Sequence, residues 1–343
     1  MIKIGVLCPS EIAFRRFMPA LMQSNSFCYV GIGVPTCSER FGEETLSLSE
    51  KQAIHTAELK KAEAFQKEYG GQIFDGYLAL LSADLDAVYI PLPPALHFPW
   101  AKKALEAGKH VFVEKPATVS FAQSAALVAL AEDRGLALCE NYMFVFHKQL
   151  EEIDQILKSG KIGETRLISL KFGFPMRAKN DFRYNKQLGG GALIDAGGYT
   201  IRLASILLGD SITMQSASLC VPKGFEVDLY GSATAVNEDG LCAQLSFGMD
   251  NDYRCEVEIW GSRGTLRSGR VFTAPAGFVP TASISLNNQT EQCTLSADDT
   301  FLRSIDFFRS CVEDSSLRAR SFSDILRQAK LVDQVKALAG QDR

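Results

Sequence analysis

Short apolar runs alternate with helix-spaced apolar residues over the first third of the chain. The short runs predict buried strands, at residues 2–7, 28–34, 86–91, 109–114 and 136–142. The helix-spaced stretches predict helices, at residues 12–23, 47–69, 97–107 and 121–134. Strands that alternate with helices are typical of an α/β protein with a doubly wound parallel sheet.

Helix boundaries in this region are marked by local signals. Residues 47–50 (Ser-Leu-Ser-Glu) have the pattern of a capping box, which predicts a helix that begins there. Gly70 and Gly71 predict its end near Tyr69. We expect residues 35–47 to be irregular, and residues 39–61 to be an insertion of unassigned role.

The pattern changes after about residue 150, where strand-like runs follow one another. They occupy residues 165–174, 213–221, 231–237, 242–247, 255–260 and 264–268. Helices are expected at 150–159, 196–208, 302–313 and 323–338. This pattern predicts a large, mostly antiparallel sheet with helices on one side. We therefore predict two domains, residues 1–119 and 120–343, without a flexible linker.

Composition and charge narrow the range of functions. The chain of 343 residues has a net charge of −4, which gives no general electrostatic attraction to nucleic acid or to an anionic membrane. No apolar run approaches the ~18 residues of a membrane span. The chain opens on a strand rather than a signal peptide, so a cytoplasmic protein is expected. Nine scattered cysteines without a C-x-x-C pair predict reduced thiols and no metal site.

The turn after the first strand is a candidate phosphate site. A strand, a tight turn and a helix at this position are typical of dinucleotide folds, in which helix amides bind the pyrophosphate. The turn is weak as a motif, because Cys8 and Ser10 stand where glycines are usual and Glu11 adds a negative charge. An ordinary strand-to-helix turn is the alternative. The candidate residues are Cys8, Ser10, Glu11, Ile12 and Ala13.

The end of the second strand bears on the choice of nucleotide. NAD-specific proteins often carry an acidic residue there for the ribose 2′-hydroxyl, and residues 32–36 have none. Ser38 and Arg40 lie slightly beyond and could meet a 2′-phosphate, which favours NADP over NAD. They could also be solvated loop residues.

Two longer segments carry a family resemblance. Residues 107–116 (AGKHVFVEKP) and 188–199 (LGGGALIDAGGY), together with 90–93 (IPLP) and Leu96-His97, resemble the Gfo/Idh/MocA oxidoreductases in order and spacing. The resemblance implies an NAD(P)-binding Rossmann domain followed by a substrate and oligomerisation domain. It is closest to the glucose–fructose oxidoreductase and dihydrodiol dehydrogenase branch, which also has a tyrosine at the position of Tyr199.

The resemblance implies which residues are catalytic. Hydride transfer to or from a carbon needs an acid or base for the proton on oxygen. Tyr199 is the implied proton donor, Lys115 assists it, and Asp195 orients Lys115 or holds a substrate hydroxyl. The alternatives are a solvated lysine, a core tyrosine and a charge at a helix N-terminus.

Other positions complete the implied site. Pro91, Leu92, His97, Glu114 and Pro116 would border the cofactor, although His97 could equally be a core residue. Arg183 and Met143 would contact the substrate, and an ion pair is the alternative for Arg183. Val145 stands where relatives often have arginine, and Pro94 replaces a common asparagine.

We expect an NAD(P)-dependent oxidoreductase that acts on a sugar, sugar nucleotide or polyol. A homodimer or homotetramer formed through the second sheet is expected from the resemblance. The lost glycines and the loss at Val145 keep a second hypothesis open: a non-catalytic, ligand-binding regulatory protein on the same scaffold.

Overall fold

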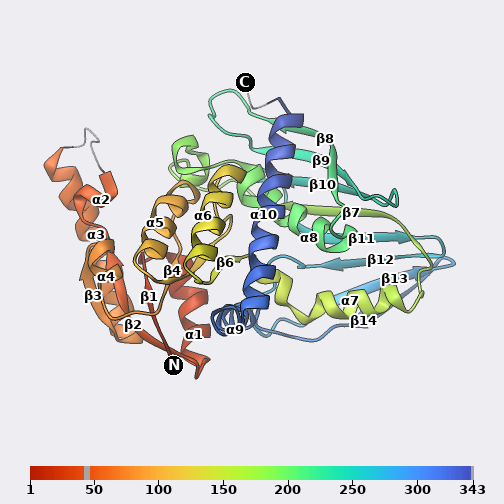
Figure 1. The fold of residues 1–343 in the computed structure, drawn as a ribbon. Coiled ribbons are helices and arrows are strands. Elements are labelled where there is room, and N and C mark those ends of the chain that lie inside the picture. Colours follow the sequence, from red (N-terminus) through yellow and green to blue (C-terminus); the bar gives the residue numbers. More distant parts are fainter. Residues whose placement is uncertain (42–46, 341–343) are drawn as a thin grey trace. The chain divides into compact units, whose positions relative to one another are not determined.

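The computed structural model describes residues 1–41 and 47–340, and the chain divides into two compact units (Figure 1). The first unit comprises Met1–Thr118, Ala122–Asn141 and Ser304–Ile325, and the second comprises Val119–Phe121, Tyr142–Arg303 and Leu326–Arg343. The first unit thus extends beyond the predicted range of 1–119. It does so because strand β6 (Leu138–Asn141) pairs with β5 (His110–Glu114), and because helix α9 (Thr300–Glu313) places Phe308 on Phe112, 5.0 Å between ring centroids.

The sheet of the first unit is parallel throughout and has the strand order β3-β2-β1-β4-β5-β6. This is the doubly wound order expected from the sequence. The remaining strands are β1 (Ile2–Val6), β2 (Phe27–Val34), β3 (Gln72–Asp75) and β4 (Ala87–Ile90). The order reverses at β1, between its neighbours β2 and β4, and ligands of such sheets bind beyond the carboxyl ends of the strands at this point.

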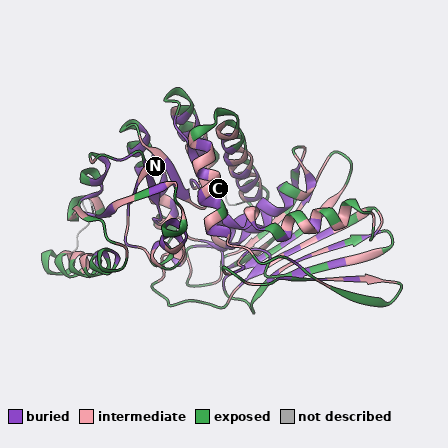
Figure 2. Cartoon of the chain, turned by 90° about the horizontal axis from the view of Figure 1, so that it is seen from below, coloured by how far each residue is buried: buried purple, intermediate pink, exposed green. Residues whose placement is uncertain are grey.

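Helices connect these strands. A π-helical turn (Ala13–Phe17) runs directly into α1 (Met18–Gln23), and the others are α2 (Cys37–Phe41), α3 (Leu48–Tyr69), α4 (Tyr77–Leu81), α5 (Pro94–Glu106) and α6 (Phe121–Asp133). The predicted capping box is confirmed, because the Ser47 hydroxyl accepts from the Glu50 amide and the Glu50 carboxylate accepts from the Ser47 amide. Helix α3 is largely exposed and buries only Glu58, Ala62 and Phe65 (Figure 2).

The second unit contains an eight-stranded sheet in the order β14-β13-β12-β11-β7-β10-β9-β8. Only β7 (Thr165–Gly173) and β10 (Cys242–Gly248) run parallel to each other, so the sheet is mostly antiparallel as predicted. The other strands are β8 (Thr213–Cys220), β9 (Tyr230–Val236), β11 (Arg254–Gly261), β12 (Gly264–Gly269), β13 (Thr281–Leu286) and β14 (Gln289–Thr294). Ile168, Leu170 and Phe172 of β7 face the core, whereas Ser169 and Lys171 face outward.

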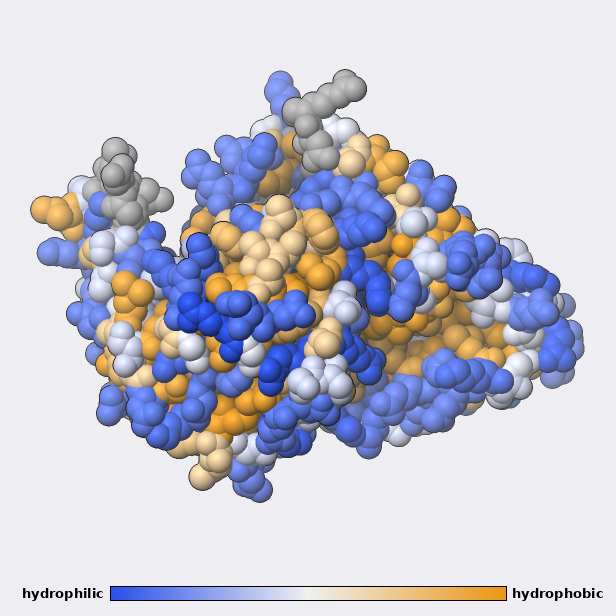
Figure 3. Space-filling model, viewed as in Figure 1, coloured by the Kyte–Doolittle hydropathy of each residue, from blue (hydrophilic) through white to orange (hydrophobic). Residues whose placement is uncertain are grey.

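Helices α7 (Lys148–Lys158), α8 (Gly198–Leu208) and α10 (Ser315–Leu338) complete the chain, and a π-helical turn (Leu193–Gly197) precedes α8. Residues 186–208 are long and apolar enough to cross a membrane, judged by length and composition alone. However, 78% of the 18-residue window that meets this criterion is buried inside the protein, as in the core helix of a folded domain. On the face shown in Figure 3, hydrophilic residues are spread over both units.

Candidate active site

The turn after β1 is organised by Ser10. Its hydroxyl accepts a hydrogen bond from the Ala13 amide (3.2 Å), and its carbonyl accepts from the Phe14 amide (3.0 Å). Helical backbone begins at Glu11, so Ser10 is the N-cap of the segment that leads into the π-helical turn, and its hydroxyl proton remains to be donated to an anion. The fully buried Ala13 supplies the small residue that this turn requires.

The charges at this turn are less adverse to a phosphate than the sequence suggested. Glu11 forms an exposed ion pair with Arg15 at 2.8 Å, one helical turn further on. Burial raises the pKa of the Cys8 thiol to about 11, so this side chain is uncharged at neutral pH. Ile12, the next residue after Glu11, is 37% exposed and uncharged. The turn thus fits a dinucleotide phosphate despite its missing glycines.

Beyond β2, the nearest acidic residue has a structural role. The carboxylate of Glu39 accepts hydrogen bonds from the amides of Thr36, Tyr77 (3.0 Å) and Leu78 (2.9 Å), so it caps helix α4. Ser38 contacts the hydroxyl of Thr36 at 3.1 Å. The acidic group is thereby occupied by backbone amides.

Arg40, the other residue beyond β2, pairs with the buried carboxylate of Glu58 at 3.4 Å, and Lys61 contacts the same carboxylate at 2.8 Å. Two cations share one carboxylate, so these three side chains together carry one positive charge. That charge, together with the Ser38 hydroxyl, fits a ribose 2′-phosphate better than a 2′-hydroxyl.

His97 joins two loops at the carboxyl edge of the parallel sheet. It is fully buried, with Nδ1 2.7 Å from the Pro116 carbonyl oxygen and Nε2 2.7 Å from the Leu92 carbonyl oxygen. Burial lowers the pKa of His97 to about 4. The ring therefore carries one N–H at neutral pH and donates to one carbonyl at a time. His97 is a core residue that links the loops after β4, where Pro91 lies, and after β5.

Strand β5 ends at Glu114, and the Lys115–Pro116 peptide that follows it is cis. The carboxylate of Glu114 accepts from the Tyr89 hydroxyl (2.6 Å) and the Asn141 amide (2.7 Å), which project from the adjacent strands β4 and β6. Burial raises the pKa of Glu114. Glu114 therefore ties three strands together where Lys115, a partly exposed residue, leaves the sheet.

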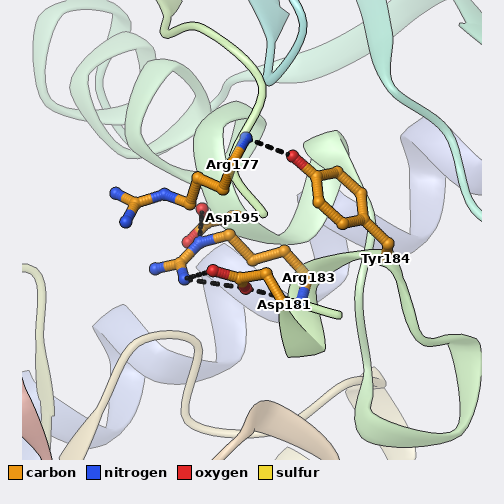
Figure 4. A network of polar contacts seen from close by, with 5 residues as sticks. All are labelled: Arg177, Asp181, Arg183, Tyr184 and Asp195. Carbon is orange, nitrogen blue, oxygen red and sulfur yellow. Dashed lines mark hydrogen bonds and ion pairs between the residues drawn. The ribbon is translucent and has the colours of Figure 1, made fainter. Parts of the chain in front are cut away.

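In the second unit, Arg183 and Asp195 come together as neighbours (Figure 4). The Nε atom of Arg183 lies 2.5 Å from Asp195 Oδ2, and its Nη1 atom lies 3.2 Å from Asp181 Oδ1. Burial would lower the pKa of Arg183, but the two carboxylates more than offset it and the pKa is raised. Arg183 is thus the partly buried partner of Asp195, which limits it as an independent substrate ligand.

Tyr199 lies on α8 in an aromatic setting. Its ring centroid is 5.0 Å from that of Phe172, 5.3 Å from Tyr142 and 5.6 Å from Phe144. Its hydroxyl lies 4.0 Å from the sulfur of Met143, which is a weak acceptor. Rigid aromatic neighbours fix the ring, so the hydroxyl is held in one direction.

Sequence reasoning missed the residue that holds the beginning of this helix. Asp228 is buried, its carboxylate accepts from the Leu193 amide (2.7 Å) and its carbonyl accepts from the Ala192 amide (2.8 Å). Gly191 has φ 120°, and a Cβ there would lie 2.5 Å from the Asp228 carboxylate. The glycines of the 188–199 segment thus admit a cap from a distant loop, which no local pattern signals.

Comparison with known proteins matches both units to one family. Residues 19–142 match the family described as "Oxidoreductase family, NAD-binding Rossmann fold". Residues 150–267 match the family described as "GFO/IDH/MocA C-terminal domain". A dTDP-3,4-didehydro-2,6-dideoxy-alpha-D-glucose 3-reductase of Actinomadura kijaniata is 38% identical over 98% of this chain and 95% of its own. A protein of the same name from Streptomyces violaceoruber is also 38% identical, with the same coverage of both chains.

Solved structures of related oxidoreductases have the same fold as this chain. A 3-ketoreductase from Actinomadura kijaniata, in complex with NADP and TDP-benzene, has a TM-score of 0.88 at 38% identity, covering 98% of this chain and 97% of that one. An aldose-aldose oxidoreductase from Caulobacter crescentus shares the fold at 19% identity, with a TM-score of 0.84 and coverage of 100% and 98%. Named reductases among the relatives do not favour the non-catalytic hypothesis. The chain therefore belongs to the GFO/IDH/MocA family and is an NAD(P)-dependent oxidoreductase.

Proposed function

We propose that this protein uses NADPH to reduce the C3 keto group of a sugar carried on dTDP. The observation that carries this proposal is the 38% identity over 98% of the chain to reductases with that substrate in their name. The NADP and TDP-benzene bound to the related 3-ketoreductase give further support. The residues beyond β2 agree, because Glu39 caps a helix and Arg40 adds positive charge.

NADPH supplies a hydride for the carbonyl carbon, and the protein must supply a proton for the oxygen. Tyr199 is the proposed donor, because a tyrosine hydroxyl can donate to an oxygen that gains negative charge. Lys115 stabilises that charge as an ammonium group, and Asp195 positions Arg183 beside the substrate. In the related 3-ketoreductase, structures exist of variants at one tyrosine and one lysine, spaced as far apart as Lys115 and Tyr199.

The test is NADPH oxidation with a dTDP-linked 3-keto sugar. Tyr199→Phe should lower kcat more than about tenfold, because the proton donor is lost. It should leave the NADPH dissociation constant within about twofold, since the cofactor turn belongs to other residues. Phe307→Leu, a change elsewhere in the chain, serves as the control. A Tyr199→Phe enzyme with full turnover would exclude the proton-donor role.

We also propose that the protein is cytoplasmic and self-associates. All nine cysteines are free, as expected in a reducing compartment. The outward face of the large sheet presents alternating charges, with Lys171 3.5 Å from Glu256, and the exposed ring of Trp260 on the same face of β11. A face with both signs of charge and an exposed aromatic residue suits contact with a second copy.

A further inference from the structure

We propose that residues 174–187 bind the diphosphate group of the nucleotide-linked substrate, with Arg177 as its main ligand. The inference rests on the proposed function, because it assumes that the sugar is carried on a nucleoside diphosphate. It assigns a site for the one part of such a substrate that carries two negative charges.

The charge balance of this segment is the first argument. The whole chain has a net charge of −4, but residues 174–195 have a net charge of +2. The cations are Arg177, Lys179, Arg183 and Lys186, and the acids are Asp181 and Asp195. Arg183 binds both acids, and this trio carries a net charge of −1, so the other three cations leave the segment with an excess of two positive charges. A dianionic ligand would balance this excess.

The placement of Arg177 is the second argument. Its side chain is exposed and its guanidinium carbon lies 5.4 Å from the ring centroid of Phe174. Within the described parts of the chain, that guanidinium group makes no ion pair or hydrogen bond. Arginine offers a planar fork of donors that matches phosphate oxygens, and stacking on a ring orients the fork before the ligand arrives.

Hydrogen bonds fix the backbone around Arg177, whereas its side chain contacts only the ring of Phe174 among the interactions of the described residues. The Arg177 amide donates to the Tyr184 hydroxyl at 2.7 Å. The Phe174 amide donates to the Gly248 carbonyl (3.1 Å), and the Asn251 amide donates to the Phe174 carbonyl (3.1 Å). These bonds reduce the ordering cost of binding.

The site also adjoins the catalytic helix. Figure 4 shows the guanidinium groups of Arg177 and Arg183 pointing to the same side, and Arg183 contacts Asp195. Asp195 lies about one helical turn before Tyr199. A diphosphate held by Arg177 would therefore place the attached sugar along the helix that carries Tyr199.

The test is calorimetric titration of the NADP-saturated protein with dTDP and, separately, with thymidine. Arg177→Ala should weaken dTDP binding at least tenfold and change thymidine binding less than twofold, because only the diphosphate contact is lost. Arg177→Lys should restore part of the affinity through its charge. Arg166→Ala, an exposed arginine at the opposite end of β7, is the matched control and should bind dTDP as the unaltered protein does.

Three results would overturn the inference: unchanged dTDP affinity in Arg177→Ala, an equal loss for thymidine, or no binding of dTDP by the unaltered protein. A loss of NADP affinity in Arg177→Ala would also overturn it, because the diphosphate would then be that of the cofactor. Arg177-dependent dTDP binding without turnover of any dTDP-linked keto sugar would support the inference and contradict the proposed function. Normal turnover of a dTDP-linked keto sugar with an unchanged KM in Arg177→Ala would support the proposed function and contradict the inference.

Discussion

At the scale of single residues, a carboxyl group holds the backbone that carries each of the two proposed catalytic residues, Lys115 and Tyr199. Glu114 anchors the strand end that carries Lys115, and Asp228 caps the helix that carries Tyr199. Asp228 is buried and Glu114 is partly buried, and burial raises the pKa of both carboxyls. Burying a carboxylate is costly unless it is hydrogen-bonded, which explains why each accepts amide or hydroxyl donors.

His97 should make the protein less stable in mild acid. Its pKa is lowered to about 4 in the fold, against an ordinary value near 6.5. Between these two values the unfolded chain binds more protons than the folded one, so stability falls as the pH falls from about 6.5 to 4. His97→Gln should flatten that part of the curve of unfolding free energy against pH, measured by urea denaturation.

His97→Gln should also cost about 1–3 kcal/mol at pH 7, because the flexible amide replaces a buried ring that lies at 2.7 Å from both carbonyl oxygens and cannot reproduce that geometry. His55→Gln, at a partly exposed ring that contacts the Pro35 carbonyl, serves as the control for the effect of a histidine-to-glutamine change on stability at pH 7. His110 and His147 also have pKa values lowered by burial, so part of the slope should remain in both variants. A full slope in His97→Gln would show that this ring is not protonated on unfolding.

At the scale of elements, the helix 193–208 depends on a cap that is distant in sequence. Asp228→Ala should destabilise the fold by about 1–2 kcal/mol in urea denaturation, because the Leu193 amide loses its acceptor. The same variant should lower kcat, since Tyr199 follows within two helical turns. The Asp228→Asn variant keeps an acceptor oxygen and removes the cost of the buried charge, so it should stay close to the original in both measurements.

The two Asp228 variants distinguish the loss of the hydrogen bond to the Leu193 amide from a general effect of changing the side chain. If the Asn and Ala variants lose equal stability, hydrogen bonding to Leu193 does not explain the role of Asp228. If both keep full kcat, the cap does not position Tyr199.

How far the sequence predicts the elements depends on the periodicity of each. Strands with apolar alternation, such as β7 and β11, were predicted to within a residue or two. The hairpin β13–β14 was not, because its residues are mostly polar and β14 lies at the sheet edge. The short elements β3, α2 and α4 were also missed, since four or five residues carry too little pattern. No local pattern predicts the contacts of a side chain with a backbone amide elsewhere in the fold, as made by Asp228, Glu39 and Tyr184.

At the scale of the whole molecule, self-association through the large sheet is the prediction to test. The Trp260 side chain is 58% exposed on the outward face of β11. A charged residue at the centre of a contact between copies would be desolvated without a partner. Trp260→Glu should therefore lower the mass measured by light scattering, whereas Tyr253→Glu, outside β11, should not. A monomeric unaltered protein at micromolar concentration would contradict the proposal.

Residues 304–325, which follow the large sheet in the sequence, pack into the nucleotide-binding unit. Phe308 is fully buried and stacks on Phe112 and on Phe27, at 5.0 and 6.2 Å between ring centroids. The ribosome makes Phe308 more than 160 residues after the last strand of the parallel sheet, which ends at Asn141. Until Phe308 has been made, Phe27 and Phe112 lack the ring that packs on them, so we expect the nascent chain to expose this apolar surface. Messages truncated before residue 304 should yield a product that chaperones and proteases remove, although every predicted cofactor-binding residue is present.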